Sequence, residues 1–191
     1  MSKEDWRENN LVKIFKEKNL WNIPEDITIL DVACGLSLRS KYIPAKARVG
    51  VDIYEEYFKH IESDVPYTIV KGDVRILTTL FPSKSFDVVI ALDIVEHLDK
   101  EDAISMLAQC EQIARIAVIV ETPEGFVPQD IDILGYGGDT WQTHRSAWLL
   151  DDFTERGYSA FTRDYKMTDK KRHSTLNVSP DIKLIDAIKY V

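Results

Sequence analysis

The sequence predicts an α/β protein with a doubly wound, mostly parallel, seven-stranded sheet and helices on both faces. Apolar runs of strand length alternate with amphipathic segments, which is typical of right-handed βαβ units in one sheet. The run 86–92 is almost continuously apolar, as expected of a parallel strand covered on both faces. In addition, successive apolar runs end at an aspartate at nearly equal intervals, namely at Asp31, Asp52, Asp73 and Asp93.

The first 120 residues supply five of the expected strands. We expect them over 27–32, 49–53, 67–70, 86–92 and 116–120, each an apolar run that ends in turn residues. An N-terminal helix over about 3–20 precedes them, because Leu11, Ile14 and Phe15 recur at helical spacing and Pro24 breaks the pattern. Further helical patterns occur over 54–58 and over 99–115, where Asp99 is a suitable N-cap.

The regular alternation stops after the fifth strand. The segment 121–145 contains two prolines and four glycines without a clear period, and a connection of this length is usually functional or disordered. Beyond it we expect a helix over 146–156 with Gly157 just past its end, strands over 158–166 and 175–178, and a terminal helix over 181–191. Residues 1–191 are expected to form one domain, with 121–145 on the substrate side.

Composition excludes several classes of function. The net charge of −8 disfavours a nucleic-acid-binding surface, which needs clustered lysine and arginine. Two cysteines provide no disulfide framework, which fits a reduced cytoplasmic setting. The N-terminus shows no signal peptide, and no apolar run approaches the ~20 residues that span a bilayer. We therefore expect no nucleic-acid or membrane partner, and the oligomeric state stays open.

The aspartates at the strand ends indicate a nucleoside-bearing cofactor. Carboxyl ends of parallel strands meet at one edge of a sheet, and a carboxylate after the second strand is well placed to accept ribose hydroxyls. Both a nicotinamide dinucleotide and S-adenosylmethionine fit this arrangement. The dinucleotide fingerprint, however, places its three glycines on Ala33, Gly35 and Leu38, of which only the middle one is glycine. A cationic sulfonium cofactor has no phosphate to accommodate, so S-adenosylmethionine is favoured.

Two segments carry a resemblance to a known family. Asp31-Val32-Ala33-Cys34-Gly35-Leu36-Ser37 resembles the first motif of class I S-adenosylmethionine-dependent methyltransferases. The segment from Phe86 to Leu98 resembles the fourth-strand region of that family, which often ends in a Glu-His-Leu triplet, here 96–98. The resemblance spans about 27–121 and departs from the family where Ala33 and Ser37 replace common glycines. It implies the Rossmann-like methyltransferase fold.

The resemblance also implies which residues hold the cofactor. Asp31 and the backbone of Ala33, Cys34 and Gly35 would hold the methionine portion, and Asp52 with the adjacent Ile53 would hold the ribose. Asp73 and the Val74 N–H would contact the adenine. The Asp93 backbone would face the amino group, and Ile94 or Val95 would shield the sulfonium. Each position also has a plain structural alternative. Asp31 can cap the following segment, Asp52 and Asp73 can be turn residues, and Cys34 can be a small buried residue.

The acceptor side is predicted from a cluster of chemistry-bearing residues over 141–148. We expect His144 and Arg145 to face the acceptor and Trp141 to form a wall. His144 or His97 is the candidate general base, because an imidazole titrates near neutral pH. Alternatively, His144 packs against the sheet while Arg145 pairs with a carboxylate. No His, Cys, Asp or Glu set has metal-ligand spacing, so no metal is expected.

Together these features predict methyl transfer from S-adenosylmethionine to a small-molecule or glycan acceptor. The alternative is a methyltransferase-like protein that binds the cofactor without turnover and acts as a regulatory or scaffolding subunit.

Overall fold

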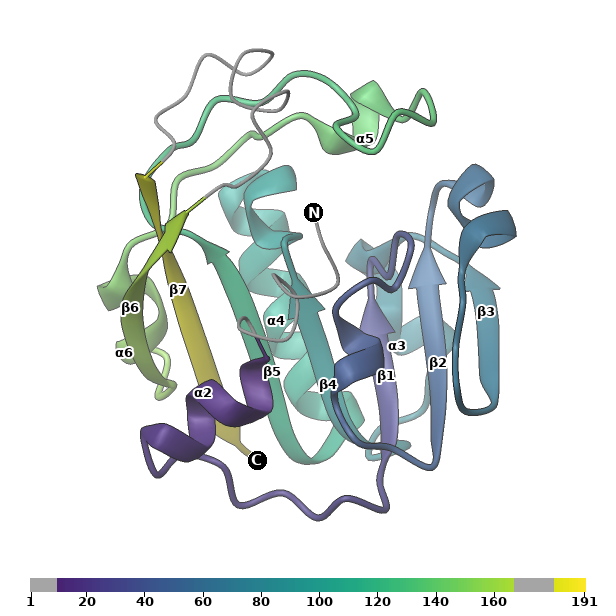
Figure 1. The fold of residues 1–191 in the computed structure, drawn as a ribbon, viewed down its shortest axis with the longest axis vertical. Helices are drawn as coiled ribbons and strands as arrows, with labels where there is room; N and C mark the ends of the chain where they lie inside the picture. The colour runs from purple at the N-terminus through teal and green to yellow at the C-terminus, as the bar shows by residue number, and fades with distance from the viewer. Residues whose placement is uncertain (1–9, 167–180) are drawn as a thin grey trace.

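The computed structural model describes residues 10–166 and 181–191, and within them seven strands form one sheet (Figure 1). The strand order is β3-β2-β1-β4-β5-β7-β6. The strands are β1 (Thr28–Val32), β2 (Ala47–Asp52), β3 (Tyr67–Lys71), β4 (Phe86–Leu92), β5 (Ala114–Pro123), β6 (Ser159–Lys166) and β7 (Asp181–Tyr190). Strands β1 to β5 pair in parallel, whereas β7 runs antiparallel to both β5 and β6. This confirms the predicted mostly parallel, doubly wound sheet.

Helices lie on both faces of the sheet. They are α2 (Leu11–Glu17), α3 (Leu77–Leu80), α4 (Lys100–Ile113), α5 (Asp139–Gln142) and α6 (Leu150–Thr154), with short 3-10 helices at Ser40–Tyr42, Glu55–His60, Val74–Ile76 and Val95–His97. In Figure 1, α2 lies in front of the sheet, whereas α3 and α4 lie behind it. The Asn10 side chain caps α2 by accepting hydrogen bonds from Val12 and Lys13.

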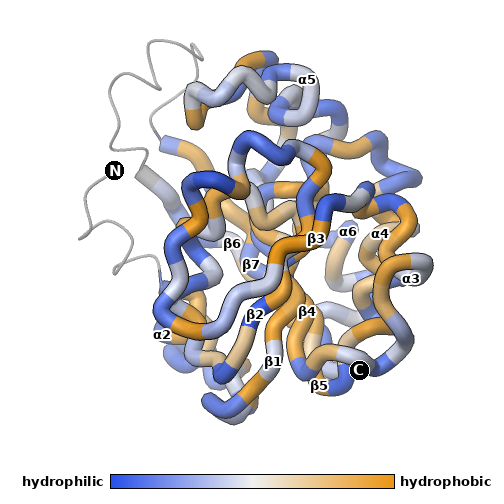
Figure 2. The backbone as a smooth tube through the Cα atoms, turned by 90° about the vertical axis from the view of Figure 1, so that its right-hand side faces the viewer, coloured by the Kyte–Doolittle hydropathy of each residue, from blue (hydrophilic) through white to orange (hydrophobic). Residues whose placement is uncertain are grey.

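Each face of the sheet has its own hydrophobic core. In β4, the fully buried Val88 and Ile90 face α2, and the equally buried Val89 and Ala91 face α4. This alternation follows from the period of two along a strand, and it explains why β4 reads as a continuous apolar run. The hydrophobic colouring in Figure 2 is concentrated accordingly along the central strands.

The predicted terminal helix over 181–191 is wrong, because this segment forms strand β7. Leu184, Ile185 and Ile188 have a spacing that also suits a helix, but residues 184–188 are all buried between β5 and β6. Burial on both sides by distant strands overrides the local pattern. The expected strand over 175–178 and the start of the expected helix over 3–20 lie outside the described residues.

Two predicted helices differ from the expectation. The pattern over 54–58 forms a 3-10 helix, and the helix expected over 146–156 begins only at Leu150. The residues before Leu150 are held in extended form, since Ser146 Oγ donates to the carbonyl of Val95 and Trp148 pairs with Gly125. Strand β5 begins directly where α4 ends, two residues earlier than predicted.

The segment 124–149 crosses above the carboxyl ends of the strands (Figure 1). Its two ends are tied together where Gly125 N donates to the carbonyl of Trp148 at 2.7 Å. Its middle is organised by Asp132, whose carboxylate accepts hydrogen bonds from the backbone of Leu134, Tyr136 and Gly138. Among the described residues, no helix is long and apolar enough to cross a membrane.

Candidate functional site

Two cavities lie at the carboxyl ends of the strands, below the segment 124–149. We call one the histidine cavity; its volume is about 220 Å³, and Asp31, Glu96, His97 and His144 lie in its wall. We call the other the aspartate cavity; its volume is about 250 Å³, and Asp52, Asp73, Ile94, Trp141 and Arg145 lie in its wall. The residues that line both are Ala33, Gly35, Asp93, His97 and Gln142. The cavities therefore meet between β1 and β4, where the strand order reverses and where ligands of such sheets bind.

Ten of the eleven residues predicted to hold the cofactor line one cavity or the other, and Val95, the alternative to Ile94, lines neither. Asp31 and Cys34 lie in the wall of the histidine cavity, and Asp52, Ile53, Asp73, Val74 and Ile94 in that of the aspartate cavity, whereas Ala33, Gly35 and Asp93 lie in both. Residues up to 63 positions apart in sequence are thus brought to one edge of the sheet.

The turn after β1 has an unusual backbone. Ala33, Gly35 and Ser37 all have positive φ, at 54°, 49° and 53°. A Cβ atom at Gly35 would meet nothing within 4 Å, so the space above this residue is open. Ala33 and Ser37 are the two positions at which the family commonly has glycine, and their left-handed backbone supplies the physical reason for that preference.

Asp31 stabilises this turn through hydrogen bonds to its carboxylate. Its carboxylate is 4% exposed and accepts hydrogen bonds from Ser37 Oγ at 3.1 Å and from Tyr67 OH at 3.3 Å. Burial raises its pKa to about 6, and hydrogen bonds from Ser40, Ser37 and Tyr67 oppose this rise. Cys34, next in the turn, is buried, and burial raises the pKa of its thiol, so it carries no nucleophilic thiolate.

Asp52 connects the end of β2 with the turn after β1. Its Oδ2 accepts a hydrogen bond of 2.9 Å from Gly35 N, and its Oδ1 accepts one of 2.9 Å from Tyr54 N. Burial raises the pKa of this carboxyl, and the backbone hydrogen bonds oppose the rise. A carboxylate can accept more than two hydrogen bonds, and Asp52 lines the aspartate cavity, so hydroxyl donors in this cavity can reach it.

Asp73 is engaged by a neighbouring side chain. Arg75 Nε lies 3.0 Å from both of its oxygens, and Arg75 N donates to Oδ1 at 2.9 Å. This arginine lowers the pKa of Asp73, which is therefore ionised at neutral pH. Arg75 also lines the aspartate cavity, so it lies beside Asp73 and Val74, the two residues predicted to contact the adenine.

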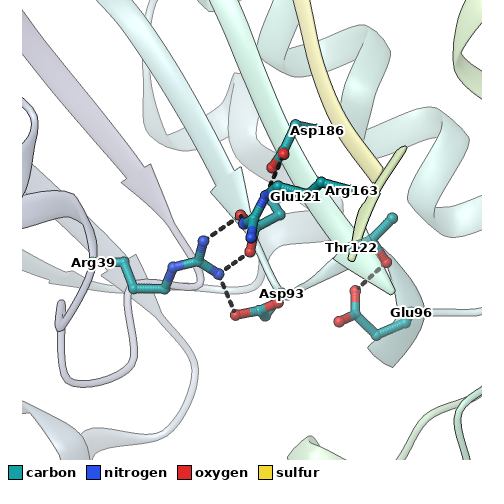
Figure 3. Close-up of polar contacts among 7 residues, drawn as sticks. All are labelled: Arg39, Asp93, Glu96, Glu121, Thr122, Arg163 and Asp186. Atoms are coloured by element: carbon teal, nitrogen blue, oxygen red, sulfur yellow. Dashed lines mark hydrogen bonds and ion pairs between the residues drawn. The ribbon is translucent and has the colours of Figure 1, made fainter. Parts of the chain in front are cut away.

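A buried ion network stands behind the junction of the cavities (Figure 3). Glu121 and Asp186 are fully buried, and Glu121 pairs with both Arg39 and Arg163. Arg39 also reaches Asp93 Oδ2 at 3.1 Å, and Arg163 reaches Asp186 Oδ2 at 2.5 Å. The network joins the turn after β1 to β4, β5, β6 and β7. The sequence analysis did not predict Arg39, Arg163 or Asp186 as parts of the site. The available signal was Asp186, a charged residue inside an apolar run, which indicates a buried ion pair.

The two predicted catalytic histidines lie next to each other. The rings of His97 and His144 are 4.6 Å apart between centroids and nearly perpendicular. Burial lowers the pKa of His97 to about 4 and also lowers that of His144, so both imidazoles are uncharged at neutral pH. Glu96, which precedes His97, is buried, and its Oε2 accepts a hydrogen bond from Thr122 Oγ1 at 2.8 Å. Burial raises the pKa of this carboxyl.

Trp141 and Arg145 do not share the histidine cavity with His144. Both line the aspartate cavity, beside Asp52 and Asp73. Arg145 binds backbone oxygens, with Nε 3.1 Å from the carbonyl of His97 and Nη2 2.9 Å from that of Thr140. The guanidinium thus links the segment 124–149 to the 3-10 helix after β4. Among the described residues, it forms no ion pair with a carboxylate.

Comparisons with known proteins agree with this geometry. Residues 29–116 match the family model of the methyltransferase domain. Comparison of the sequence with curated proteins gives no match. The fold resembles that of a provisionally assigned methyltransferase from Bacillus halodurans C-125, with a TM-score of 0.66, 14% identity and coverage of 95% of this chain and 98% of the other.

Two further solved structures are similar at the level of the fold. One is an S-adenosylmethionine-dependent methyltransferase from Archaeoglobus fulgidus, with a TM-score of 0.57, 20% identity and coverage of 96% of this chain and 94% of the other. The other is the magnesium protoporphyrin IX methyltransferase of Synechocystis PCC 6803 with bound S-adenosylmethionine, with a TM-score of 0.57, 16% identity and coverage of 96% and 79%.

The sheet order and the cavities at its switch point agree with the match to a methyltransferase domain. The matched residues run from β1 to β5 and include every predicted cofactor-binding position. Over residues 29–116 the chain thus matches a methyltransferase domain, and at 14–20% identity the solved structures show the same fold.

Proposed function

We propose that the protein transfers the methyl group of S-adenosylmethionine to a small-molecule or glycan acceptor that occupies the histidine cavity. The observation that carries this proposal is the joining of two cavities at one shared wall. The predicted cofactor residues are distributed over both cavities, and the candidate base His97 stands where they meet. A methyl group at this junction is within reach of an acceptor on the other side.

The aspartate cavity suits the adenosine half of the cofactor. Asp52 would accept the ribose hydroxyls, with Ile53 beside it, and Asp73 with Val74 would contact the adenine. Trp141 and Arg145 were expected to contact the acceptor. They line the aspartate cavity instead and are better placed to cover the nucleoside. The methionine half would extend past Gly35, where the backbone leaves open space, toward Asp31 and Asp93.

The histidine cavity suits an acceptor of modest size with a polar reacting end. Val127, Leu134, Ile182 and Leu184 supply an apolar wall, and Gln129 and Tyr165 add polar groups. The volume of about 220 Å³ is small compared with the 300–1,000 Å³ of drug-sized pockets. A small molecule or the terminal sugar of a glycan fits this size.

The reaction needs little chemistry from the protein. The acceptor atom attacks the methyl carbon in line with the carbon–sulfur bond, and the sulfonium departs as a neutral thioether. Positioning and exclusion of water supply most of the acceleration. His144 or His97, both uncharged, can accept the acceptor proton as a general base.

Thermal unfolding in the presence of candidate ligands tests this proposal. A ligand that binds only the native state adds about 2.7 kcal/mol at one hundred times its Kd. We expect S-adenosylmethionine and S-adenosylhomocysteine to raise the midpoint, and NAD to leave it unchanged. Absence of a shift with both adenosyl compounds contradicts the proposal. A shift without transfer to any member of an acceptor panel favours the alternative, a binding protein without turnover.

A further inference from the structure

The strongest unexplained feature of the site is a cluster of three metal-ligand side chains. In the part of the chain that the structure describes, Glu96, His97 and His144 each offer a ligand atom, and these atoms all lie within 4.8 Å of one another. His97 and Glu96 follow β4, whereas His144 comes from the segment 124–149. Two imidazoles and one carboxylate form a typical three-ligand set of metal sites with an open position.

Hydrogen bonds from outside the cluster orient two of its side chains, His144 and Glu96, as is common for metal ligands. His144 Nδ1 lies 2.5 Å from the carbonyl oxygen of Val127, so this nitrogen carries the proton and Nε2 keeps its lone pair. Such an outer hydrogen bond fixes the tautomer and raises the basicity of a ligating histidine. Glu96 is anchored in the same way through Thr122, and Figure 3 shows its second oxygen pointing away from that bond.

A second, independent observation is an unsatisfied atom. His97 is 7% exposed, and its Nδ1 is buried without a hydrogen-bond partner among the described residues. A buried polar atom without a partner costs about 1–3 kcal/mol, so such atoms in folded proteins call for a specific explanation. A ligand at the cluster would supply one.

The charges around the cluster favour a cation. Glu96 is joined by Asp93, which acts electrostatically on Glu96 and on both histidines. The positive charge of Arg39 is opposed by Asp93 and by the buried Glu121. Among the described residues, Arg75 and Arg145 are the other cations that line the two cavities. Arg75 pairs with Asp73, and Arg145 binds the backbone carbonyls of His97 and Thr140.

We propose that Glu96, His97 and His144 bind a divalent transition-metal ion of the Zn²⁺ type at the junction of the two cavities. Two imidazole ligands favour this class over Mg²⁺ or Ca²⁺, which prefer oxygen ligands. Ligand atoms around one Zn²⁺ lie about 3.3 Å apart, so the cluster contracts by at most about 1.5 Å on binding. Contraction of this size requires the three side chains to rotate toward one another on binding.

This inference rests on the proposed function and adds to it the chemistry of the acceptor. A metal ion at this position selects an acceptor with a hydroxyl group. All three ligands line the histidine cavity, so the open coordination position faces the acceptor. The metal-bound hydroxyl loses its proton to solvent, because coordination lowers its pKa. Its oxygen then forms the bond to the methyl carbon while the carbon–sulfur bond breaks and its electron pair stays on sulfur. The products are a methyl ether and S-adenosylhomocysteine. In this form the histidines act as ligands, and neither accepts the proton.

Titration of the chelator-treated, full-length protein with Co²⁺ tests the site directly. We expect one equivalent of Co²⁺ to bind with a visible absorption band, and Zn²⁺ to displace it. Glu96→Gln and His144→Ala should each weaken Co²⁺ binding at least 10-fold. His60→Gln removes an exposed histidine outside both cavities and should leave binding unchanged. Absence of saturable Co²⁺ binding, or binding that Glu96→Gln and His144→Ala leave intact, overturns the metal site.

Cofactor binding distinguishes a failure of the proposed metal site from a failure of the proposed function. Thermal shift with S-adenosylmethionine on the metal-free protein reports the cofactor site alone. If the shift persists but Co²⁺ does not bind, the metal site is wrong and the proposed function stands; if Co²⁺ binds but no adenosyl compound does, the proposed function fails. Transfer to hydroxyl acceptors should fall at least 10-fold after chelation and recover with Zn²⁺. Transfer that chelation leaves unchanged overturns the role of the ion in catalysis.

Discussion

The carboxylate of Asp52 accepts a hydrogen bond of 2.9 Å from the backbone N–H of Gly35, which joins the end of β2 to the turn after β1. Two elements of the cofactor site are therefore coupled through one side chain. The charge that would bind ribose hydroxyls also holds the open backbone at Gly35 in place. Removal of this charge should affect binding more than stability, because the burial of Asp52 already opposes its ionised form.

The first prediction follows from this bond. Asp52→Asn keeps the shape of the side chain but removes the charge, and a hydrogen bond to a charged group is worth about 1.5–3 kcal/mol. The affinity for S-adenosylhomocysteine, measured by calorimetry, should fall by at least 10-fold. Asp64→Asn alters an aspartate whose side chain is 72% exposed and should bind normally. Equal affinities for the Asp52 variant and the unaltered protein would contradict the assignment of the ribose site.

The second prediction concerns the buried ion network. Glu121→Gln leaves Arg39 and Arg163 without the charge that faces both, and breaking a buried pair costs about 3–5 kcal/mol. The free energy of unfolding, measured in urea, should fall by an amount in that range. Glu111→Gln is the matched control, because its pair with Lys189 is partly exposed and should contribute less than about 1 kcal/mol. A loss at Glu121 no larger than that at Glu111 would show that the network contributes no special stability.

Local patterns were sufficient to predict the parallel half of the sheet. Strand β4 has the predicted bounds Phe86–Leu92, because it is covered on both faces and its run is apolar except at Asp87. The aspartates at the strand ends could be placed together because parallel strands bring their carboxyl ends to one edge. The two cavities of the structure lie at this edge.

The antiparallel part and the metal-ligand cluster were not accessible to such patterns. Strand β7 is specified by its neighbours β5 and β6 rather than by its own periodicity. His144 meets His97 only because the segment between them folds back over the sheet, so no spacing in the sequence indicates the pair. The helix expected over 146–156 begins only at Leu150, because Ser146 Oγ donates to the distant carbonyl of Val95. The segment 121–145 has no clear period in its sequence, and hydrogen bonds to Asp132 organise its middle.

The third prediction tests the backbone of the turn. Ala33 has a φ of 54°, and a left-handed conformation costs a non-glycine residue about 1–2 kcal/mol. Ala33→Gly relieves this cost but adds about 0.5–1 kcal/mol of unfolded-state entropy. The net effect on the free energy of unfolding should be between zero and a gain of about 1.5 kcal/mol. Ala108→Gly makes the same change on the exposed side of α4 and should cost about 1 kcal/mol. Similar losses at both positions would rule out strain at Ala33.

The last prediction concerns the pH dependence of stability that Asp31 confers. Its pKa in the folded protein is about 6, above the ordinary value of 3.8, so the folded state binds this proton more tightly than the unfolded state. The resulting stabilisation is fully present below pH 3.8 and is lost as the pH rises through about 6. In Asp31→Asn this dependence is absent, while the amide oxygen still accepts hydrogen bonds from Ser37 and Tyr67. Relative to the unaltered protein, the variant should therefore gain about 2–3 kcal/mol between pH 4 and pH 8. Urea unfolding of both proteins at a series of pH values measures this difference. A difference that stays constant with pH would mean that burial does not hold the carboxyl in its protonated form.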